Sequence, residues 1–322
     1  MTFLANPLPN HANVSQGASL SRNTVVIGQP PTFWLFSERD GWDLTHPPIP
    51  SSPPVYPRLT MRTSTSPVTI APSKTALVII DMQNFFLSTA LGRKRGQGHD
   101  AEEVLLKHGI PAARKAGIQI LWLTWGIPTE NLKSIPPIIW RIFGWESVKT
   151  TEQAADSDDL GSVRERKSET GLGSSLGDVK LEDGTVVDAG RMLIRDQWNT
   201  ALHAPLEAAF QEGLKAKVPD VRFHKERLSG TWGGSNDCER FLEKQGIKTL
   251  LFAGVNTDQC VLATLEDSCS KSWDTILLKD ACGTTSPDYA TKMVHHNCQK
   301  SWGFLSSCKE LVAGVENLVE SE

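Results

Sequence analysis

Three residues far apart in the sequence could act together on a substrate: Asp81, Lys225 and Cys260, which are an acid, an amine and a thiol. Asp81 follows the apolar run TALVII, Lys225 follows a predicted strand at 221–224, and Cys260 ends the loop GVNTDQC after a predicted strand at 249–253. Because ligands bind beyond the carboxyl ends of the strands in open α/β sheets, the three side chains are expected to converge at one edge. A thiol beside an acid and an amine can attack a carbonyl group as a nucleophile.

Each of these residues also has a purely structural alternative. Burial would raise the pKa of Asp81 and make it a competent base, but Asp81 could instead cap a helix or bind a loop amide. Lys225 could be a solvated charge in a basic turn. Cys260 lies at a predicted helix N-terminus, where the dipole stabilises a thiolate, or it is one more buried cysteine. His295 and His296 are assigned to the surface or core of a late helix, not to catalysis.

The elements that must position these residues alternate between strands and helices. Strands are predicted at 75–80, 119–124, 221–224, 249–253, 275–279 and, at an edge, 304–307. Helices are predicted from a capping box at Asp100 and Glu103, after Pro205, from Asn236 to Gly246, over 261–271 and from about Pro287. This alternation predicts an α/β fold, a three-layer αβα Rossmann-like arrangement with a mainly parallel sheet of about six strands.

Two segments depart from the alternation. Residues 1–73 are rich in Pro, Ser, Thr and Asn and are predicted to form an N-terminal arm. Several aromatic residues within it indicate that about 24–48 lie ordered across the body or a neighbouring subunit. Residues 145–192 are a charged, Gly/Ser-rich insertion with a hairpin that turns on Asp183-Gly184. This insertion is predicted to be a lid or an interface, and the sequence leaves open which of the two.

The composition excludes several classes of function. There are 33 basic and 37 acidic residues, a net charge of −4 and a sequence pI near 6.1, which argues against nucleic-acid binding. No apolar run reaches the roughly 18 residues of a membrane span, and no signal peptide is expected. The six cysteines form no CxxC pair, so reduced thiols and a cytoplasmic location are predicted.

Taken together, three motifs resemble those of the isochorismatase-like cysteine hydrolases. TALVIIDMQNFF resembles that family's first strand, with Asp81 at its catalytic aspartate. FHKERLSGTW resembles its lysine segment, with Lys225, and GVNTDQCV its nucleophile loop, with Cys260. The resemblance spans about residues 74–312 without the insertion, and it implies an isochorismatase-like hydrolase domain over 74–322.

The resemblance also implies a mechanism. Asp81 would take the thiol proton, Lys225 would stabilise the charges, and Cys260 would form a thioester with the substrate. A cis peptide bond between Val255 and Asn256 is implied as well. The backbone amides of Asn256 and Cys260 would then form the oxyanion hole.

Comparison within the family narrows the prediction. The D-x-H metal motif of nicotinamidases is missing, so neither a catalytic metal nor another cofactor is predicted. True isochorismatases lack the nucleophilic cysteine, so the pattern is closest to ureidoacrylate amidohydrolase and biuret hydrolase-like members. Trp125 could equally be a core aromatic residue. The candidate substrate-binding residues are Gln83, Phe86, Trp125, Glu130 and Asn199.

The sequence therefore predicts a metal-independent cysteine amidohydrolase that cleaves a small amide or ureido C–N bond through a thioester on Cys260. A homo-oligomer, either a dimer or a tetramer, is expected. One alternative is a hydrolase of another small substrate, such as an ester, a lactam or an isochorismate-like enol ether. The other is a catalytically silent binding protein with the same fold. The particular substrate stays open, because the shape of the pocket depends on the insertion.

Overall fold

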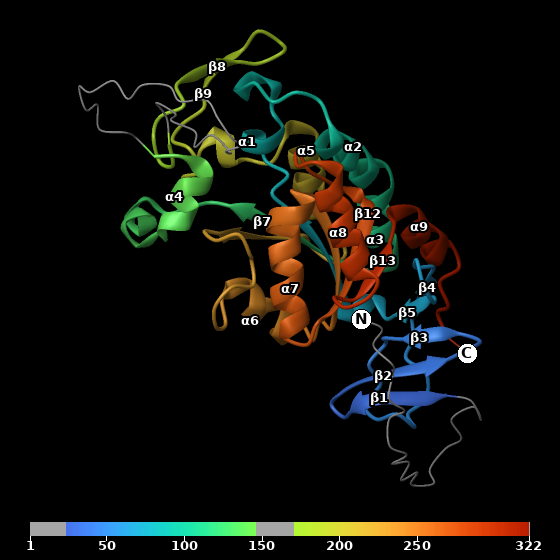
Figure 1. Cartoon of the computed structure of the whole chain (residues 1–322). Coiled ribbons are helices and arrows are strands. Elements are labelled where there is room, and N and C mark those ends of the chain that lie inside the picture. Colours follow the sequence, from blue (N-terminus) through green and yellow to red (C-terminus); the bar gives the residue numbers. More distant parts are fainter. Residues whose placement is uncertain (1–23, 146–170, 322) are drawn as a thin grey trace.

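The central sheet of the protein is built mainly from short apolar runs. The computed structural model describes residues 24–145 and 171–321. The sheet has six strands, all parallel, in the order β10–β7–β6–β11–β12–β13 (Figure 1). The strands are β6 (Thr75–Ile80), β7 (Gln119–Trp125), β10 (Val221–Lys225), β11 (Thr249–Val255), β12 (Asp274–Gly283) and β13 (Phe304–Ser306). The predicted fold class is confirmed.

Helices cover both faces of this sheet. Alternate residues of β6 point to opposite cores, with Leu77 in one apolar cluster and Val78 in the other. The first cluster is closed by α2 (Gln97–Val104), α3 (Ile110–Ala116), α5 (Ala204–Gly213) and α9 (Cys308–Glu316). The second is closed by α4 (Pro137–Phe143), α6 (Asp237–Lys244), α7 (Leu262–Ser270) and α8 (Asp288–Cys298). The central strands β6 and β11 are buried on both sides, and their apolar residues run without interruption, whereas the edge strand β10 is half-buried and carries Arg222 and His224.

Two helix starts illustrate how local chemistry decides the boundaries. The capping box of Asn236 and Glu239 opens α6, as predicted. Helix α2, however, begins at Gln97 with Gly96 as its N-cap, whereas the sequence predicted Asp100 as the N-cap. There the His99 ring accepts the backbone N–H of Gly96 at 3.2 Å and supplies the cap. The helix then widens into a π-helical turn over Leu105–Gly109 before α3.

The segment around Cys260 also differs from the prediction. A π-helical turn, η6 (Thr257–Val261), precedes α7, so Cys260 lies inside the first turn of the helix rather than at its N-terminus. The carbonyl oxygen of Asn256 accepts the N–H groups of both Gln259 and Val261, at 3.0 and 3.2 Å. The bond from Val261, five residues after Asn256, makes this turn wider than an α-helical turn. The spacing of apolar residues in the sequence does not reveal such a turn.

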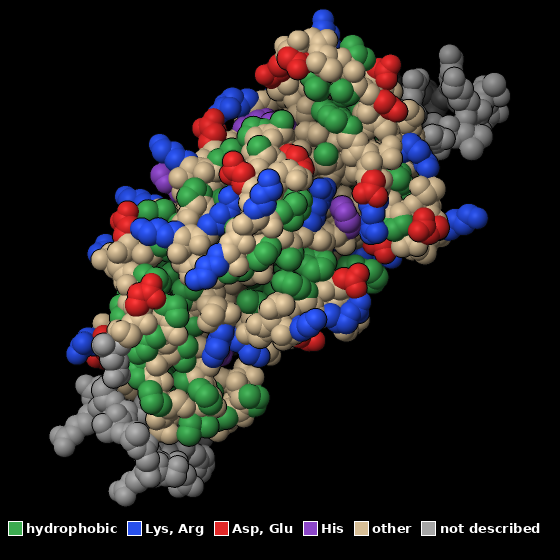
Figure 2. Space-filling view, turned by 180° about the vertical axis from the view of Figure 1, so that it is seen from behind, with side chains coloured by type: hydrophobic (Ala, Val, Ile, Leu, Met, Phe, Trp, Pro, Cys, Tyr) green, Lys and Arg blue, Asp and Glu red, His purple; other side chains and the backbone are tan. Residues whose placement is uncertain are grey.

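Residues 25–70 form a second, five-stranded sheet in the order β1–β2–β3–β5–β4. Its strands are β1 (Val25–Gln29), β2 (Thr32–Ser37), β3 (Gly41–Asp43), β4 (Leu59–Met61) and β5 (Val68–Ile70). Inward-facing residues such as Met61 and Ile70 join the first core cluster, so the small sheet shares a core with the large one. On its outer side Val25 and Ile27 are exposed. Figure 2 shows hydrophobic side chains gathered at the lower left end of the molecule.

Polar contacts fix this small sheet at the amino ends of the large sheet's strands. Asp274, the first residue of β12, accepts the indole N–H of Trp34 at 2.7 Å and lies 2.6 Å from His46 Nε2. The Lys74 ammonium, just before β6, donates to the carbonyl oxygen of His46 at 2.6 Å. The small sheet therefore lies at the edge opposite to the one where Asp81 was predicted.

The described part of the insertion forms the hairpin β8 (Asp178–Lys180) and β9 (Val186–Asp188), which are paired antiparallel. Residues 146–170 of the predicted insertion lie outside the described residues. Bridges from Gln83 to Leu202 and from Ile127 to Ile194 attach the following chain to the carboxyl edge of the sheet. Within the described residues, no helix combines the length and apolarity that crossing a membrane requires.

Candidate active site

Asp81 stands at the carboxyl end of β6 and is fully buried. Its φ of 54° lies in the left-handed region, which Asp tolerates better than most residues. Its backbone N–H donates to the carbonyl oxygen of Leu123 on β7 at 2.9 Å. The chain therefore turns away only after the hydrogen bonds between β6 and β7 have ended. One carboxylate oxygen accepts the backbone N–H of Trp125 at 3.2 Å. The carboxylate is thus held by the neighbouring strand.

Lys225 is the last residue of β10, and its side chain is almost completely buried. Its ammonium lies 2.9 Å from the other Asp81 oxygen and donates to the carbonyl oxygen of Arg227 at 3.2 Å. It also lies 3.9 Å from the centroid of the Trp125 ring, close enough for a cation–π interaction. A buried cation therefore has a carboxylate, a carbonyl and an aromatic face as partners.

Cys260 lies in η6, directly beyond β11, and is 5% exposed. Burial raises its pKa to about 12, while Lys225 lowers this pKa and Asp81 raises it. Burial likewise raises the pKa of Asp81, and the opposing effects of Lys225 and of a hydrogen bond with Cys260 do not cancel the rise. Since each group influences the others, the three predicted catalytic residues form one buried cluster at the carboxyl edge.

The peptide bond between Val255 and Asn256 is cis. Within the described residues, the backbone N–H of Asn256 has no hydrogen-bond acceptor. The side-chain amide of Asn256 donates to Gln259 at 3.4 Å. Asn256 thus presents an unpaired backbone donor one turn before Cys260.

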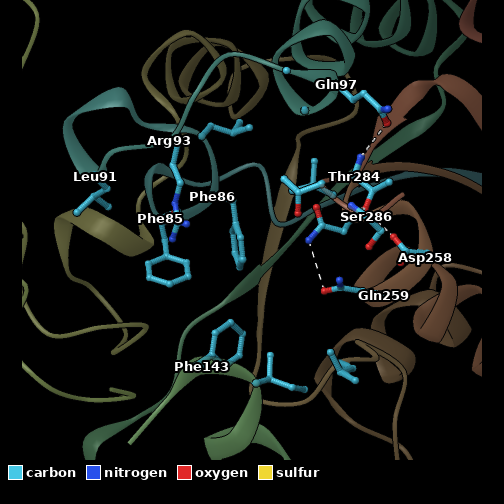
Figure 3. A pocket seen from close by; sticks show the side chains of 18 of the residues that line it. Phe85, Phe86, Leu91, Arg93, Gln97, Phe143, Asp258, Gln259, Thr284 and Ser286 are labelled. Carbon is cyan, nitrogen blue, oxygen red and sulfur yellow. Dashed lines mark hydrogen bonds between the residues drawn. The ribbon is translucent and has the colours of Figure 1, made fainter. Parts of the chain in front are cut away.

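A cavity of about 1200 Å³ opens beside this cluster. Figure 3 shows aromatic side chains on one side of it and polar side chains on the other. The aromatic wall consists of Phe85, Phe86 and Phe143, and the Arg93 guanidinium lies over the Phe85 ring, 4.8 Å from its centroid. The polar wall consists of Gln97, Asp258, Gln259, Thr284 and Ser286. Asn256 lines the cavity, whereas the side chains of Asp81, Lys225 and Cys260 lie behind its surface.

The predicted substrate-binding residues are placed differently from one another. Phe86 lines the cavity, and Trp125 lies between the cavity's Phe143 and the Lys225 ammonium. Glu130 is exposed and is not among the residues that line the cavity.

Gln83 and Asn199 are fully buried, and both bind backbone groups. The Gln83 amide donates to the carbonyl oxygens of Trp125 and Thr200, each at 2.8 Å, and accepts the Trp125 N–H at 2.8 Å. The Asn199 amide donates to Ala189 at 2.7 Å and accepts from Leu193 at 2.9 Å. These bonds tie the chain after the insertion to itself and to the carboxyl edge.

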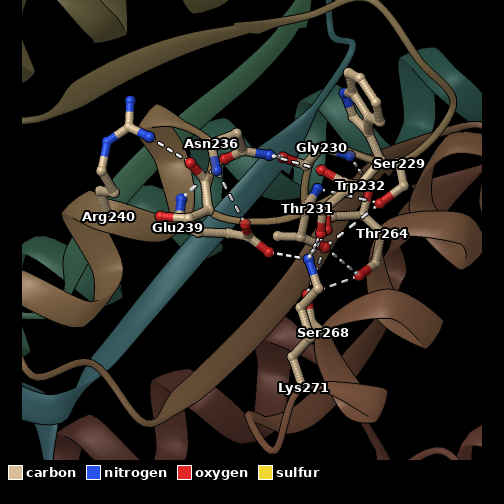
Figure 4. A network of polar contacts seen from close by, with 12 residues as sticks. Ser229, Gly230, Thr231, Trp232, Asn236, Glu239, Arg240, Thr264, Ser268 and Lys271 are labelled. Carbon is tan, nitrogen blue, oxygen red and sulfur yellow. Dashed lines mark hydrogen bonds and ion pairs between the residues drawn. The ribbon is translucent and has the colours of Figure 1, made fainter.

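A polar network behind Cys260 was not predicted from the sequence. The Thr264 hydroxyl donates to the Cys260 carbonyl at 2.7 Å and accepts the Gly230 N–H at 3.1 Å. Thr231 and Ser268 extend the network, and the Lys271 ammonium lies against Glu239 at its far end (Figure 4). It connects the loop after Lys225 to the helix that carries Cys260.

Among the residues described, no cluster of three His, Cys, Asp or Glu side chains could hold a metal ion. The polar groups that contact the Asp81 carboxylate are the Lys225 ammonium, the Cys260 thiol and the backbone N–H of Trp125. These groups are hydrogen-bond donors to the carboxylate rather than partners in a shared metal site.

A parallel αβα sheet with a thiol, a carboxylate and an ammonium at its carboxyl edge defines the class of protein as an α/β enzyme. The Isochorismatase domain family model matches residues 189–307. Ureidoacrylate amidohydrolase RutB from Caulobacter segnis is 28% identical over 75% of this chain and 85% of its own. The same enzyme from Rhizobium rhizogenes is 24% identical over 82% of this chain and 92% of its own.

A solved structure, the cysteine hydrolase from Pseudomonas syringae pv. phaseolicola, shares the fold with a TM-score of 0.51. It is 15% identical and covers 80% of this chain and 97% of its own. The predicted resemblance to the isochorismatase-like hydrolases is confirmed by the family model over residues 189–307 and by the amidohydrolase relatives.

Proposed function

We propose that the protein is a cysteine amidohydrolase that cleaves an amide or ureido C–N bond without a resident metal. The observation that carries this proposal is the buried cluster of Asp81, Lys225 and Cys260 at the carboxyl edge of the sheet. The similarity to ureidoacrylate amidohydrolases supports the amide or ureido bond as the target. Oligomerisation and a cytoplasmic location stay predictions.

The first half of the reaction transfers the acyl group to sulfur. The Cys260 thiol gives its proton to Asp81, and the sulfur attacks the carbonyl carbon. The raised pKa values favour a protonated thiol at rest, so the proton moves as the attack occurs. The C–N bond then breaks, Asp81 returns the proton to the departing nitrogen, and a thioester remains on Cys260.

The second half restores the enzyme. Asp81 takes a proton from a water molecule, and the hydroxide oxygen attacks the thioester carbonyl. The C–S bond breaks, the acid leaves, and the thiolate regains its proton from Asp81. The Lys225 ammonium stabilises whichever partner carries the negative charge.

The backbone N–H groups of Asn256 and Cys260 are proposed as the oxyanion hole. The N–H of Asn256 has no other acceptor among the described residues, which leaves it available for a developing oxyanion. Loss of one such donor typically costs about 100- to 1000-fold in rate. We assign Gln83 and Asn199 to positioning, because their amides are occupied by backbone groups.

The test measures ammonia release from a panel of primary amides and ureides. Cys260→Ala and Asp81→Asn are expected to reduce kcat/KM by about 1000-fold or more, as for other residues that act as one catalytic unit. Cys269→Ala, which removes a half-buried thiol elsewhere on α7, is the matched control and should retain activity. Mass spectrometry should detect an acyl adduct on Cys260. Near-native turnover by Cys260→Ala would contradict the proposal.

A further inference from the structure

The cavity beside Cys260 is much larger than an amide group. At roughly 30 Å³ for each water-sized group, a four-atom amide head would fill about 120 Å³. That is about a tenth of the 1200 Å³ available. The remaining space can accommodate a larger substituent of the substrate, and its walls indicate the chemistry that such a substituent would meet.

The aromatic wall already shows how a further ring would pack. Phe85 and Phe86 meet edge to face, with ring centroids 5.0 Å apart and planes at 90°. Phe85 and Phe143 do so at 6.0 Å and 72°. Figure 3 shows the three rings lining one side of the cavity without filling it. Aromatic rings in such offset arrangements attract another ring beyond the effect of buried area alone.

The aromatic wall is continuous with the proposed catalytic cluster. Phe143 packs edge to face on Trp125, with centroids 5.0 Å apart and planes at 83°. The Lys225 ammonium, which is paired with Asp81, also lies over the Trp125 ring, 3.9 Å from its centroid. Asn256, whose backbone N–H has no acceptor in the part of the chain that the structure describes, lines the same cavity. A substrate whose carbonyl lies at Asn256 can therefore extend its remaining atoms along the aromatic wall.

The polar wall does not offer the same contact. The Asp258 carboxylate accepts the hydroxyl of Thr284 at 2.6 Å, and Gln97 accepts the Thr284 N–H at 3.3 Å. Gln259 already accepts from Asn256. Because these groups are engaged with one another, the aromatic wall is the side on which an apolar group gains most.

We infer that this site takes amides or ureides whose acyl side carries an arylalkyl group, with the ring held against Phe85, Phe86 and Phe143. The inference rests on the proposed function, because it assumes that the reacting carbonyl lies at Asn256 and Cys260. It adds the class of group that the rest of the substrate must carry.

The first test measures binding without turnover. Cys260→Ala protein is titrated calorimetrically with acetamide, phenylacetamide and 3-phenylpropanamide. At least one arylalkyl amide should bind tenfold or more tightly than acetamide, since extra apolar groups in such pockets bring gains of this size. Equal binding, tighter binding of acetamide, or no measurable binding of either arylalkyl amide would overturn the inference.

The second test removes a ring while keeping apolar volume. Phe86→Leu, in the Cys260→Ala background, should lower the preference for the arylalkyl amide at least threefold. Leu214→Ala, an exposed apolar residue that does not line the cavity, is the control and should leave the preference unchanged. An unchanged preference in Phe86→Leu would overturn the assignment of the ring site.

The two proposals can fail separately. An acyl adduct on Cys260 of the unsubstituted protein, formed equally well from acetamide, would support the proposed function and overturn this inference. An arylalkyl preference in binding, with turnover that survives Cys260→Ala, would overturn the proposed function and retain the ring site.

Discussion

The positive charge of Lys225 partly offsets the cost of burying the Asp81 carboxylate. Protein groups hold the pair in place: the Trp125 N–H binds Asp81, and the Arg227 carbonyl oxygen binds Lys225. Removing one member of a buried ion pair leaves an uncompensated charge, at a cost of about 3–5 kcal/mol unless the charge is neutralised. In this cluster the carboxyl group can be neutralised by a proton, because burial already raises the pKa of Asp81.

Lys225→Met is therefore expected to raise the pKa of Asp81 further, since the ammonium that opposes the effect of burial is lost. The carboxyl C=O band of Asp81, followed by infrared spectroscopy against an Asp81→Asn difference spectrum, measures this pKa. Arg222→Met, on the same strand but not bonded to Asp81, is the control. A pKa equal to that of the unsubstituted protein would show that Lys225 does not govern this carboxyl group.

The Thr264 hydroxyl connects Gly230, in the loop that follows β10, to Cys260, in the turn that precedes α7. Thr264→Val should lower the free energy of unfolding by about 1–3 kcal/mol, because the buried Gly230 N–H loses its acceptor. Thr264→Ser keeps both hydrogen bonds and should lose less stability. Urea denaturation compares them, and equal losses in the two variants would rule out the hydroxyl as the connection.

At the scale of single elements, β11 must lie very close to β6. Gly254 has a φ of 116°, and a Cβ atom built there would lie 2.0 Å from the carbonyl oxygen of Ile80. The close approach brings the turn after β11, with Cys260, beside the residue that follows β6.

Gly254→Ala is expected to destabilise the fold by about 3 kcal/mol or more, because both the conformation and the space exclude a methyl group. Gly117→Ala is the matched control. It also has positive φ, but its Cβ would meet no atom within 4 Å, so a loss of only about 1–2 kcal/mol is expected. Similar thermal unfolding of the two variants would contradict the steric argument.

Much of the fold could be predicted because the central strands β6, β7 and β11 are short, almost continuously apolar and buried. The rule that their carboxyl ends share one edge was sufficient to bring Asp81, Lys225 and Cys260 together. The rule could not distinguish side chains that face a cavity from those that bind the backbone. Gln83, for example, bonds to carbonyl groups 42 and 117 residues away, which no local pattern reveals.

The small sheet could not be predicted for a related reason. Its strands are three to six residues long, are separated by prolines, and pair partly with distant segments, as β3 does with β5. The aromatic residues indicated order in this region, but not strands. Phe143 was missed because only its packing on Trp125 connects it to the site.

At the scale of the whole molecule, buried thiols make stability depend on alkaline pH. Burial raises the pKa of Cys238, Cys260 and Cys298 to about 12, from 9.0. Above pH 9 the unfolded chain releases protons that the folded chain retains. The free energy of unfolding therefore falls as pH rises from 9 toward 12, by up to about 1.4 kcal/mol per thiol for each pH unit.

Cys238→Ala tests this dependence away from the catalytic cluster. The free energy of unfolding is measured with denaturant between pH 8 and pH 10.5. In Cys238→Ala it should fall less steeply with pH than in the unsubstituted protein, because one fewer thiol releases its proton on unfolding. Substitution of the exposed Lys94 by Ala should leave the slope unchanged. Parallel curves for Cys238→Ala and the unsubstituted protein would contradict the prediction.

The contacts of Asp274 with Trp34 and His46 have a practical consequence. They keep residues 25–50 at the amino ends of the strands, whereas the cavity opens at the carboxyl ends. A fluorophore or solid support coupled through a cysteine introduced at Val25, which is 52% exposed, would leave the mouth of the cavity accessible. Immobilised enzyme prepared in this way should accept substrates from solution as freely as the unattached form.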